Sequence, residues 1–90
     1  MPRVVRSATL VNAQGLHARP ISKLIAVARA HQAQLKVRCG AVQADGRSML
    51  QMLTLAAPNG AVLEFDADGA DAEELVVALE KLIASRFDED

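Results

Sequence analysis

The chain has 90 residues, of which 51% are hydrophobic and 2% aromatic, and its formal net charge is -1. This length predicts one small domain over residues 1–90, since a second core would not fit, and the charge argues against a nucleic-acid partner, which needs a basic stripe. No apolar run approaches the roughly 18 residues that span a bilayer, and residues 1–6 lack an export signal. With a single cysteine, which forms no internal disulfide, we expect a cytoplasmic protein.

The first third of the chain predicts a strand, a loop and a helix. Residues 4–11 are rich in β-branched side chains and lead into the polar segment 12–15, which is typical of a strand that ends in a loop. Helix formers dominate from His17 to Ala30, and the apolar ones recur on one face. Pro20 suits the first turn, because its missing N–H has no intrahelical partner to lose.

The start of this helix combines three features that suit a phosphate. His17 falls at or next to the N-cap, beside backbone N–H groups and the positive end of the helix dipole, which favour anions. Arg19 adds a forked cation two residues later. A nucleophilic imidazole, an anion site and an arginine together suggest a phosphoryl group carried on His17. The second histidine, His31, falls in the last turn, where we expect it to be exposed, and the spacing of the two histidines predicts no metal site.

The middle of the chain predicts a hairpin and a short helix. Residues 34–39 alternate between polar and apolar side chains, as in a strand with one solvated face. Gly40 interrupts the pattern, and residues 41–44 can return as the second strand of a hairpin. Ser48 then precedes an apolar segment and has Gln51 three residues later, the spacing of a capping box at a helix N-terminus.

The last third predicts a strand and a third helix. Residues 58–60 (Pro-Asn-Gly) signal a turn, and residues 61–67 alternate again. Asp71, with Glu74 at the capping-box position, marks the start of the third helix. The acidic end, residues 87–90, is expected to fray. The predicted order is strand, helix, strand, strand, helix, strand, helix, and a sheet with one solvated face and one covered by helices gives an α+β two-layer sandwich.

Two segments resemble a known family. The first is the active-site segment of HPr, the histidine-containing phosphocarrier of bacterial phosphoenolpyruvate-dependent phosphotransferase systems, which resembles Gly15-Leu16-His17-Ala18-Arg19-Pro20. The second is the family's regulatory-serine motif, which resembles Arg47-Ser48-Met49-Leu50-Gln51-Met52-Leu53. The resemblance implies an open-faced sandwich, a four-stranded antiparallel sheet covered on one face by three helices.

The resemblance is not complete, and it leaves a subgroup open. Ile21 stands where the family usually has a small residue, which raises the question of altered packing or an altered partner face. Residues 87–90 resemble the C-terminus of NPr, the HPr-like carrier of the nitrogen-related branch. Whether the chain serves sugar transport or nitrogen regulation therefore stays open at this point.

The resemblance also implies a function. In the family, enzyme I takes a phosphoryl group from phosphoenolpyruvate and passes it to the histidine of HPr, here His17, which passes it to an enzyme IIA domain. The backbone N–H of Ala18 and the guanidinium of Arg19 would stabilise the phosphate oxygens. Such a protein is a carrier and not an enzyme, and it needs no cofactor or metal.

The second motif suggests regulation and docking. Ser48 suits an N-cap, and the resemblance adds the alternative that an HPr kinase/phosphorylase modifies it. The segment after it is too apolar to be buried on one helix face, so by analogy with the family we expect Met49, Leu50 and Leu53 to point outward and contact enzyme I and enzyme IIA.

Charged residues and other functions complete the expectations. Arg29 and Arg47, with Lys23, are candidates for a basic rim that faces acidic partners. An alternative is a regulatory module of the same fold, whose phosphorylation at His17 or Ser48 controls partner proteins in carbon or nitrogen metabolism. A histidine-nucleophile phosphatase would need a second acid/base group or a metal cluster, which the sequence does not offer. We expect a monomer.

Overall fold

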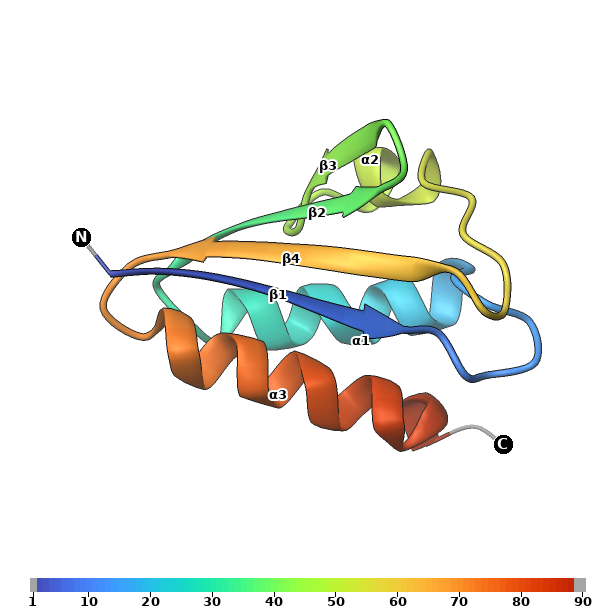
Figure 1. The fold of residues 1–90 in the computed structure, drawn as a ribbon. Helices are drawn as coiled ribbons and strands as arrows, with labels where there is room; N and C mark the ends of the chain where they lie inside the picture. The colour runs from blue at the N-terminus through green and yellow to red at the C-terminus, as the bar shows by residue number, and fades with distance from the viewer. Residues whose placement is uncertain (1, 89–90) are drawn as a thin grey trace.

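A computed structural model describes residues 2–88, in which two long helices lie against one face of a four-stranded antiparallel sheet (Figure 1). In chain order the elements are β1 (Arg3–Thr9), α1 (Ala18–Arg29), β2 (Gln34–Cys39), β3 (Val42–Asp45), α2 (Met49–Leu53), β4 (Val62–Asp68), α3 (Ala72–Ala84) and the short turn η1 (Arg86–Asp88). The predicted α+β class and element order are confirmed, with boundaries that differ by a few residues.

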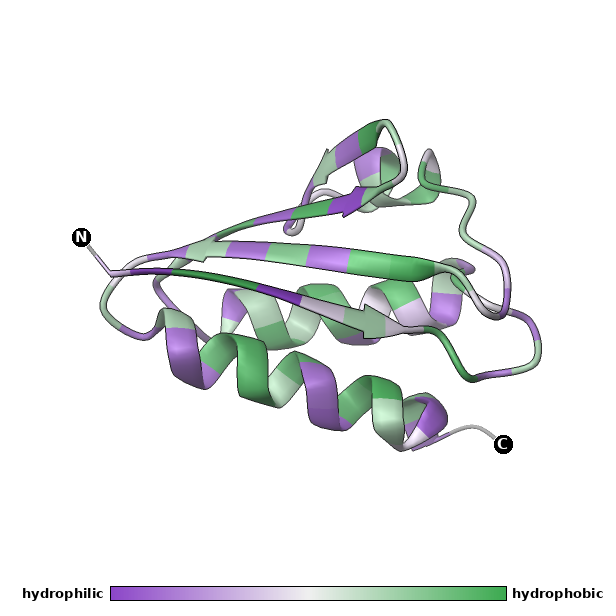
Figure 2. Ribbon diagram, in the orientation of Figure 1, coloured by the Kyte–Doolittle hydropathy of each residue, from purple (hydrophilic) through white to green (hydrophobic). Residues whose placement is uncertain are grey.

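The strands are ordered β1-β4-β2-β3, so the last strand of the sequence lies inside the sheet. It pairs with β1 on one side and β2 on the other, both antiparallel. Because successive side chains of a strand point to opposite faces, polar and apolar residues alternate along β4 (Figure 2). One face of the sheet therefore belongs to the core and the other to solvent.

The core lies between the sheet and the helices α1 and α3. Its fully buried members from β4, α1 and α3 include Leu63, Phe65, Ala67, Ile21, Leu24, Ala28, Leu75, Val76 and Leu79. Burial of each larger side chain stabilises the fold by about 1.5–3 kcal/mol. The apolar stripe of α1 is thereby fixed against the sheet, which determines where the start of this helix lies.

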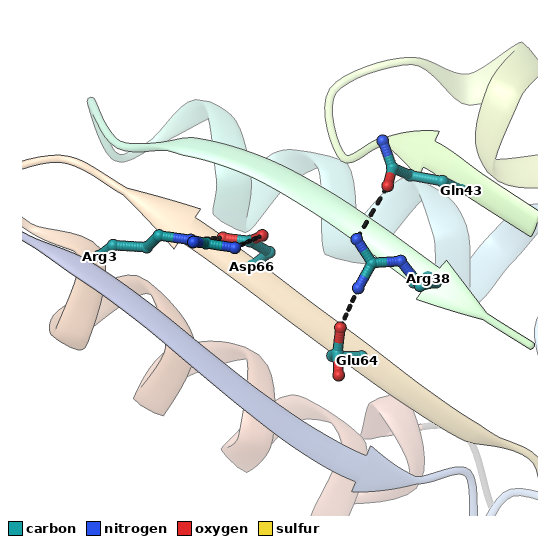
Figure 3. Close-up of polar contacts among 5 residues, drawn as sticks. All are labelled: Arg3, Arg38, Gln43, Glu64 and Asp66. Carbon is teal, nitrogen blue, oxygen red and sulfur yellow. Dashed lines mark hydrogen bonds and ion pairs between the residues drawn. The ribbon is translucent and has the colours of Figure 1, made fainter.

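Ion pairs cross the open face of the sheet (Figure 3). Arg3 of β1 donates two hydrogen bonds to Asp66 of β4, at 2.9 and 2.7 Å. Arg38 of β2 pairs with Glu64 of β4 and donates to Gln43 of β3 at 2.9 Å. Such exposed pairs contribute little stability, roughly 0–1 kcal/mol each, but they keep this face polar and confirm that it is solvated.

The C-terminal turn corrects the expectation of a frayed end. Phe87 is fully buried, and residues 86–88 all have a φ of 57°. A left-handed turn is disfavoured for non-glycine residues, and burial of the aromatic ring compensates for it. Lys23 of α1 donates a hydrogen bond to the Phe87 carbonyl, which ties this turn to α1. The expectation for residues 89–90 falls outside the described residues.

Candidate functional site

His17 is the N-cap residue of α1, as predicted, with an extended backbone (φ -122°, ψ -171°). Its carbonyl accepts the first intrahelical hydrogen bond, from Ile21 N at 3.0 Å. The half-buried imidazole accepts no capping hydrogen bond from the first turn. The ring is therefore not used to close the helix end.

The first turn of α1 suits an anion. It contains no acidic side chain, and Ala18 and Arg19 are exposed at its start. The N–H groups at this end have no carbonyl partner within the helix, and Pro20 occupies a position where its missing N–H costs nothing. Ile21, the departure from the family pattern, is fully buried. Its extra bulk fills the core and does not alter the face shown to partners.

Two hydrogen bonds between Asn12 and Gly15 close a turn in the loop before His17. Gly15 N donates to the Asn12 carbonyl at 3.2 Å, and the Asn12 side-chain amide donates to the Gly15 carbonyl at 2.6 Å. The side chain of Asn59, from the segment before β4, donates to the Asn12 carbonyl at 3.0 Å. The turn is therefore closed by its own residues and is also hydrogen-bonded to Asn59 outside it.

Gly15 also presses this loop against the segment after α2. It has a φ of 67°, and a Cβ atom at this position would lie 2.5 Å from the Ala57 carbonyl oxygen. The same carbonyl accepts a hydrogen bond from Leu16 N at 2.7 Å. Only glycine fits this combination of conformation and close approach, and it fixes the backbone two residues before His17.

The start of α2 corrects one detail of the predicted capping box. Ser48 is the N-cap and its Oγ accepts a hydrogen bond from Gln51 N at 3.2 Å, as predicted. The Gln51 side chain does not return the bond; it accepts from Asp45 N at 2.8 Å. Ser48 N is already satisfied by the Asp45 carbonyl at 3.0 Å, so the glutamine bonds the hairpin instead.

The outward orientation predicted for three residues of α2 is confirmed. Met49, Leu50 and Leu53 are 37%, 77% and 44% exposed, whereas Met52 is fully buried. The helix packs against α1 and the end of β3. An exposed apolar patch thus belongs to the helix that packs against α1.

Arg47 has a structural task at the far end of α1. Its Nη2 donates to the carbonyls of His31 at 2.5 Å and of Ala28 and Ala33 at 3.3 Å. These carbonyls lie at or just beyond the C-terminus of the helix, where the last carbonyls lack intrahelical donors; the Ala28 carbonyl also accepts from His31 N at 3.3 Å. The partner-binding role of Arg47 stays a prediction beside this one, as does that of the exposed Arg29 in the last turn.

The segment after α1 differs from the prediction at two residues. His31 lies just past the C-cap, half-buried, with its Nδ1 2.8 Å from the Val27 carbonyl. Asp71 is the N-cap of α3 but makes no side-chain cap there. Its carboxylate accepts hydrogen bonds from Gln32 N and Ala33 N at 2.9 and 2.8 Å, and these bonds hold the pKa of Asp71 below its ordinary value.

A segregation of charge along the chain was missed by the sequence reasoning. Residues 1–61 contain eight lysines and arginines and one acid, Asp45, whereas residues 62–90 contain ten acids. The helix α2 and residues 54–61 carry no charge. Both segments that adjoin His17 are therefore cationic or neutral, a signal that counting charges in windows would have found.

Two chemistries find no support in the described part of the chain. Residues 2–88 contain no group of three or more His, Cys, Asp or Glu side chains that could hold a metal ion. Among the same residues, no helix is long and apolar enough to cross a membrane.

Comparison with known proteins identifies the family of the chain. Residues 4–85 match the family model described as the PTS HPr component phosphorylation site. The chain belongs to the HPr family. Within that family, the phosphocarrier protein HPr of Cupriavidus necator is 38% identical over 84 residues, which cover 93% of this chain and 94% of the relative. The phosphocarrier protein NPr of Proteus mirabilis is 34% identical over 86 residues, covering 94% and 96%.

Solved structures of HPr proteins share the fold. The crystal structure of HPr-C-His from Thermoanaerobacter tengcongensis superposes with a TM-score of 0.89 at 31% sequence identity. The match covers 100% of this chain and 99% of that one. The HPr-like architecture expected from the sequence is confirmed.

Proposed function

We propose that this phosphocarrier accepts a phosphoryl group on His17 from phosphorylated enzyme I and passes it to an enzyme IIA domain. The observation that carries the proposal is the position of His17 as the N-cap of α1, with an imidazole that caps nothing and Arg19 exposed in the first turn. Membership of the HPr family supplies the reaction class.

The transfer is an exchange of one bond to phosphorus for another. A neutral ring nitrogen of His17 attacks the phosphorus, and the bond from phosphorus to the donor histidine of enzyme I breaks with its electron pair. The transferred oxygens then meet the N–H groups of Ala18 and Arg19 and the Arg19 guanidinium, which stabilise the added charge. The reverse exchange delivers the group to enzyme IIA, so the protein acts as a carrier and is not a catalyst.

The partners dock over the start of α1 and the exposed side of α2. Met49, Leu50 and Leu53 supply the apolar contact, with methionine able to adapt to more than one partner. Arg19, exposed in the first turn of α1, favours partners with acidic surfaces there. A monomeric carrier in the cytoplasm, where phosphoenolpyruvate is made, fits this role.

Ser48 offers a point of regulation. It is half-buried at the N-cap of α2, beside the apolar patch. Phosphorylation by an HPr kinase/phosphorylase would place charge at a helix N-terminus, which tolerates it, and would repel acidic partners. The phosphorylation state then controls which proteins bind, and this is the regulatory form of the function.

Incubation with enzyme I and phosphoenolpyruvate tests the proposal. We expect one acid-labile, base-stable phosphate per chain, absent from His17→Ala and present in His31→Ala, the matched control. Arg19→Ala should slow transfer by roughly 100-fold, the loss typical of removing one stabilising donor, without unfolding the domain. Incorporation of the same phosphate into His17→Ala would refute the proposal. Presenting enzyme IIA domains of the sugar and nitrogen-related branches then identifies the acceptor.

A further inference from the structure

Asn12 is the buried polar residue of this fold. Among residues 2–88 it alone of the polar and charged residues falls in the buried class, at 2% exposure. It lies five residues before His17, in the loop between β1 and α1. Buried polar side chains in proteins call for an explanation, because an apolar side chain fills the same space at lower cost.

The hydrogen bonds of Asn12 show what its amide does. The Nδ2 atom donates to the Gly15 carbonyl at 2.6 Å and closes the turn 12–15 from its buried side. The Oδ1 atom is buried and has no hydrogen-bond partner in the described part of the chain. The bond to the Gly15 carbonyl is therefore what the Asn12 side chain contributes to the turn.

The turn that Asn12 closes determines where His17 lies. The backbone on either side of His17 sets the position from which its side chain extends. On the helix side, Ile21 N fixes the His17 carbonyl. On the loop side, the turn is fixed through Gly15, whose N–H bonds the Asn12 carbonyl and whose carbonyl bonds the Asn12 amide.

We infer that Asn12 is a positioning residue for phosphoryl transfer: its buried amide holds the 12–15 turn so that the His17 imidazole meets the incoming phosphorus in line. The inference rests on the proposed function of His17. In-line transfer is sensitive to placement, since a displacement of about 1 Å can cost on the order of 100-fold in rate. Asn12 does not touch the phosphate; it acts through the backbone of the loop.

The test replaces the donor while keeping the shape. Asn12→Asp is isosteric but sets an acceptor against the Gly15 carbonyl. Gln43→Glu is its matched control, because it makes the same amide-to-carboxylate change on the open face of the sheet, where Arg38 still has an acceptor. Single-turnover transfer from phosphorylated enzyme I is measured for both against wild type at increasing carrier concentration.

The expected result separates positioning from docking and from folding. For folded Asn12→Asp at neutral pH, the maximal transfer rate falls roughly 10- to 100-fold, while the half-saturating carrier concentration stays within twofold and Gln43→Glu matches wild type. Lowering the pH protonates the buried carboxyl, which then donates an O–H to the Gly15 carbonyl. For protein that is folded at both pH values, the rate of Asn12→Asp relative to wild type at the same pH therefore recovers in acid.

Other outcomes overturn the inference. It fails if folded Asn12→Asp transfers within twofold of Gln43→Glu, or if its deficit lies in half-saturation alone. If Asn12→Asp does not fold, Asn12→Ser carries the same test without a buried charge, because its hydroxyl is too short to bridge the turn; transfer equal to the control refutes the inference. If wild type itself takes no phosphate on His17, the proposed function fails as well, so the two failures are distinguishable.

Discussion

The two ends of helix α1 are built in opposite ways. At the C-terminal end, side chains from elsewhere satisfy the exposed backbone groups: Arg47 donates to three carbonyls and Asp71 accepts two N–H groups of the following segment. At the N-terminal end, the His17 side chain makes no cap and the first turn holds no acid. What fixes this end is the loop before it, through Asn12 and Gly15.

The C-terminal end of α1 therefore anchors the helix, whereas the N-terminal end is left for the reaction. A helix whose far end is held by charged side chains can be placed firmly without a cap at its near end. The near end then keeps the electrostatic character that a phosphate needs. The loop before the helix, held by backbone contacts and the buried Asn12 amide, positions His17. It does so without a carboxylate that would compete with a phosphate for the N–H groups.

The largest expected effect comes from breaking the near end at Gly15. Gly15→Ala adds a Cβ in a left-handed conformation and against the Ala57 carbonyl, so we expect a loss of about 3 kcal/mol in the free energy of unfolding. Urea denaturation measures it. Gly40→Ala is the matched control, because Gly40 has a φ of 60° but open space around it. Equal losses in the two variants would show that the close approach to Ala57 contributes nothing.

A smaller effect is expected at the far end. Arg47→Ala removes the side-chain donor to the carbonyls of His31 and Ala33 after α1, and we expect a loss of about 1–3 kcal/mol in the free energy of unfolding. All three bonds come from Nη2, and Arg47→Lys keeps the charge but places its donor nitrogen one bond short of that position, so it should lose most of the same stability. Arg29→Ala, an exposed change nearby, should stay within about 0.5 kcal/mol of wild type. Thermal unfolding of the three variants decides whether Arg47 acts through geometry or charge.

The smallest expected effect is on the pH dependence of stability, and it involves Asp71 near the C-terminal end of α1. Because the pKa of Asp71 is lowered in the folded protein, its contribution to stability is present above the ordinary value near 4 and is lost as the pH falls through the lowered one. Asp71→Asn should therefore be less stable than wild type near neutral pH and show a shallower loss below about pH 4.

Urea midpoints across this range measure the effect. Asp66→Asn is the comparison, since the hydrogen bond from Arg3 lowers the pKa of Asp66 on the open face. An unchanged acid dependence in Asp71→Asn would show that its bonds to Gln32 and Ala33 carry no stability.

Much of the fold was predictable because it rests on local periodicity. The alternation over 34–39 gave β2 with its observed bounds, and the apolar spacing after Pro20 gave α1 within one residue at each end. His17 at the N-cap followed from a proline near a helix start. The excess of apolar residues in one short helix predicted that some of them point outward, and the resemblance to the family indicated Leu50 and its neighbours.

The misplaced details share a cause. Asp71 and Gln51 have the residue types and spacing of helix caps, yet the Asp71 side chain bonds Gln32, 39 residues away, and the Gln51 side chain bonds Asp45 of the preceding strand. Phe87 looked like part of a polar tail, but its side chain is fully buried as a member of the hydrophobic core. The local sequence pattern limits which partners a side chain can have. The partner it bonds depends on which donor or cavity the folded chain brings within reach.

The sequence by itself determined the class of fold, the histidine and the arginine at a helix start, and the separation of positive from negative charge. These depend on residue type and spacing, which survive without tertiary information. Only the tertiary structure decided that Arg47 caps α1, that Gly15 abuts Ala57 and that Asn12 is buried beneath the turn before His17. Each of these contacts depends on how the helices pack on the sheet. The periodicity of the sequence does not predict that packing.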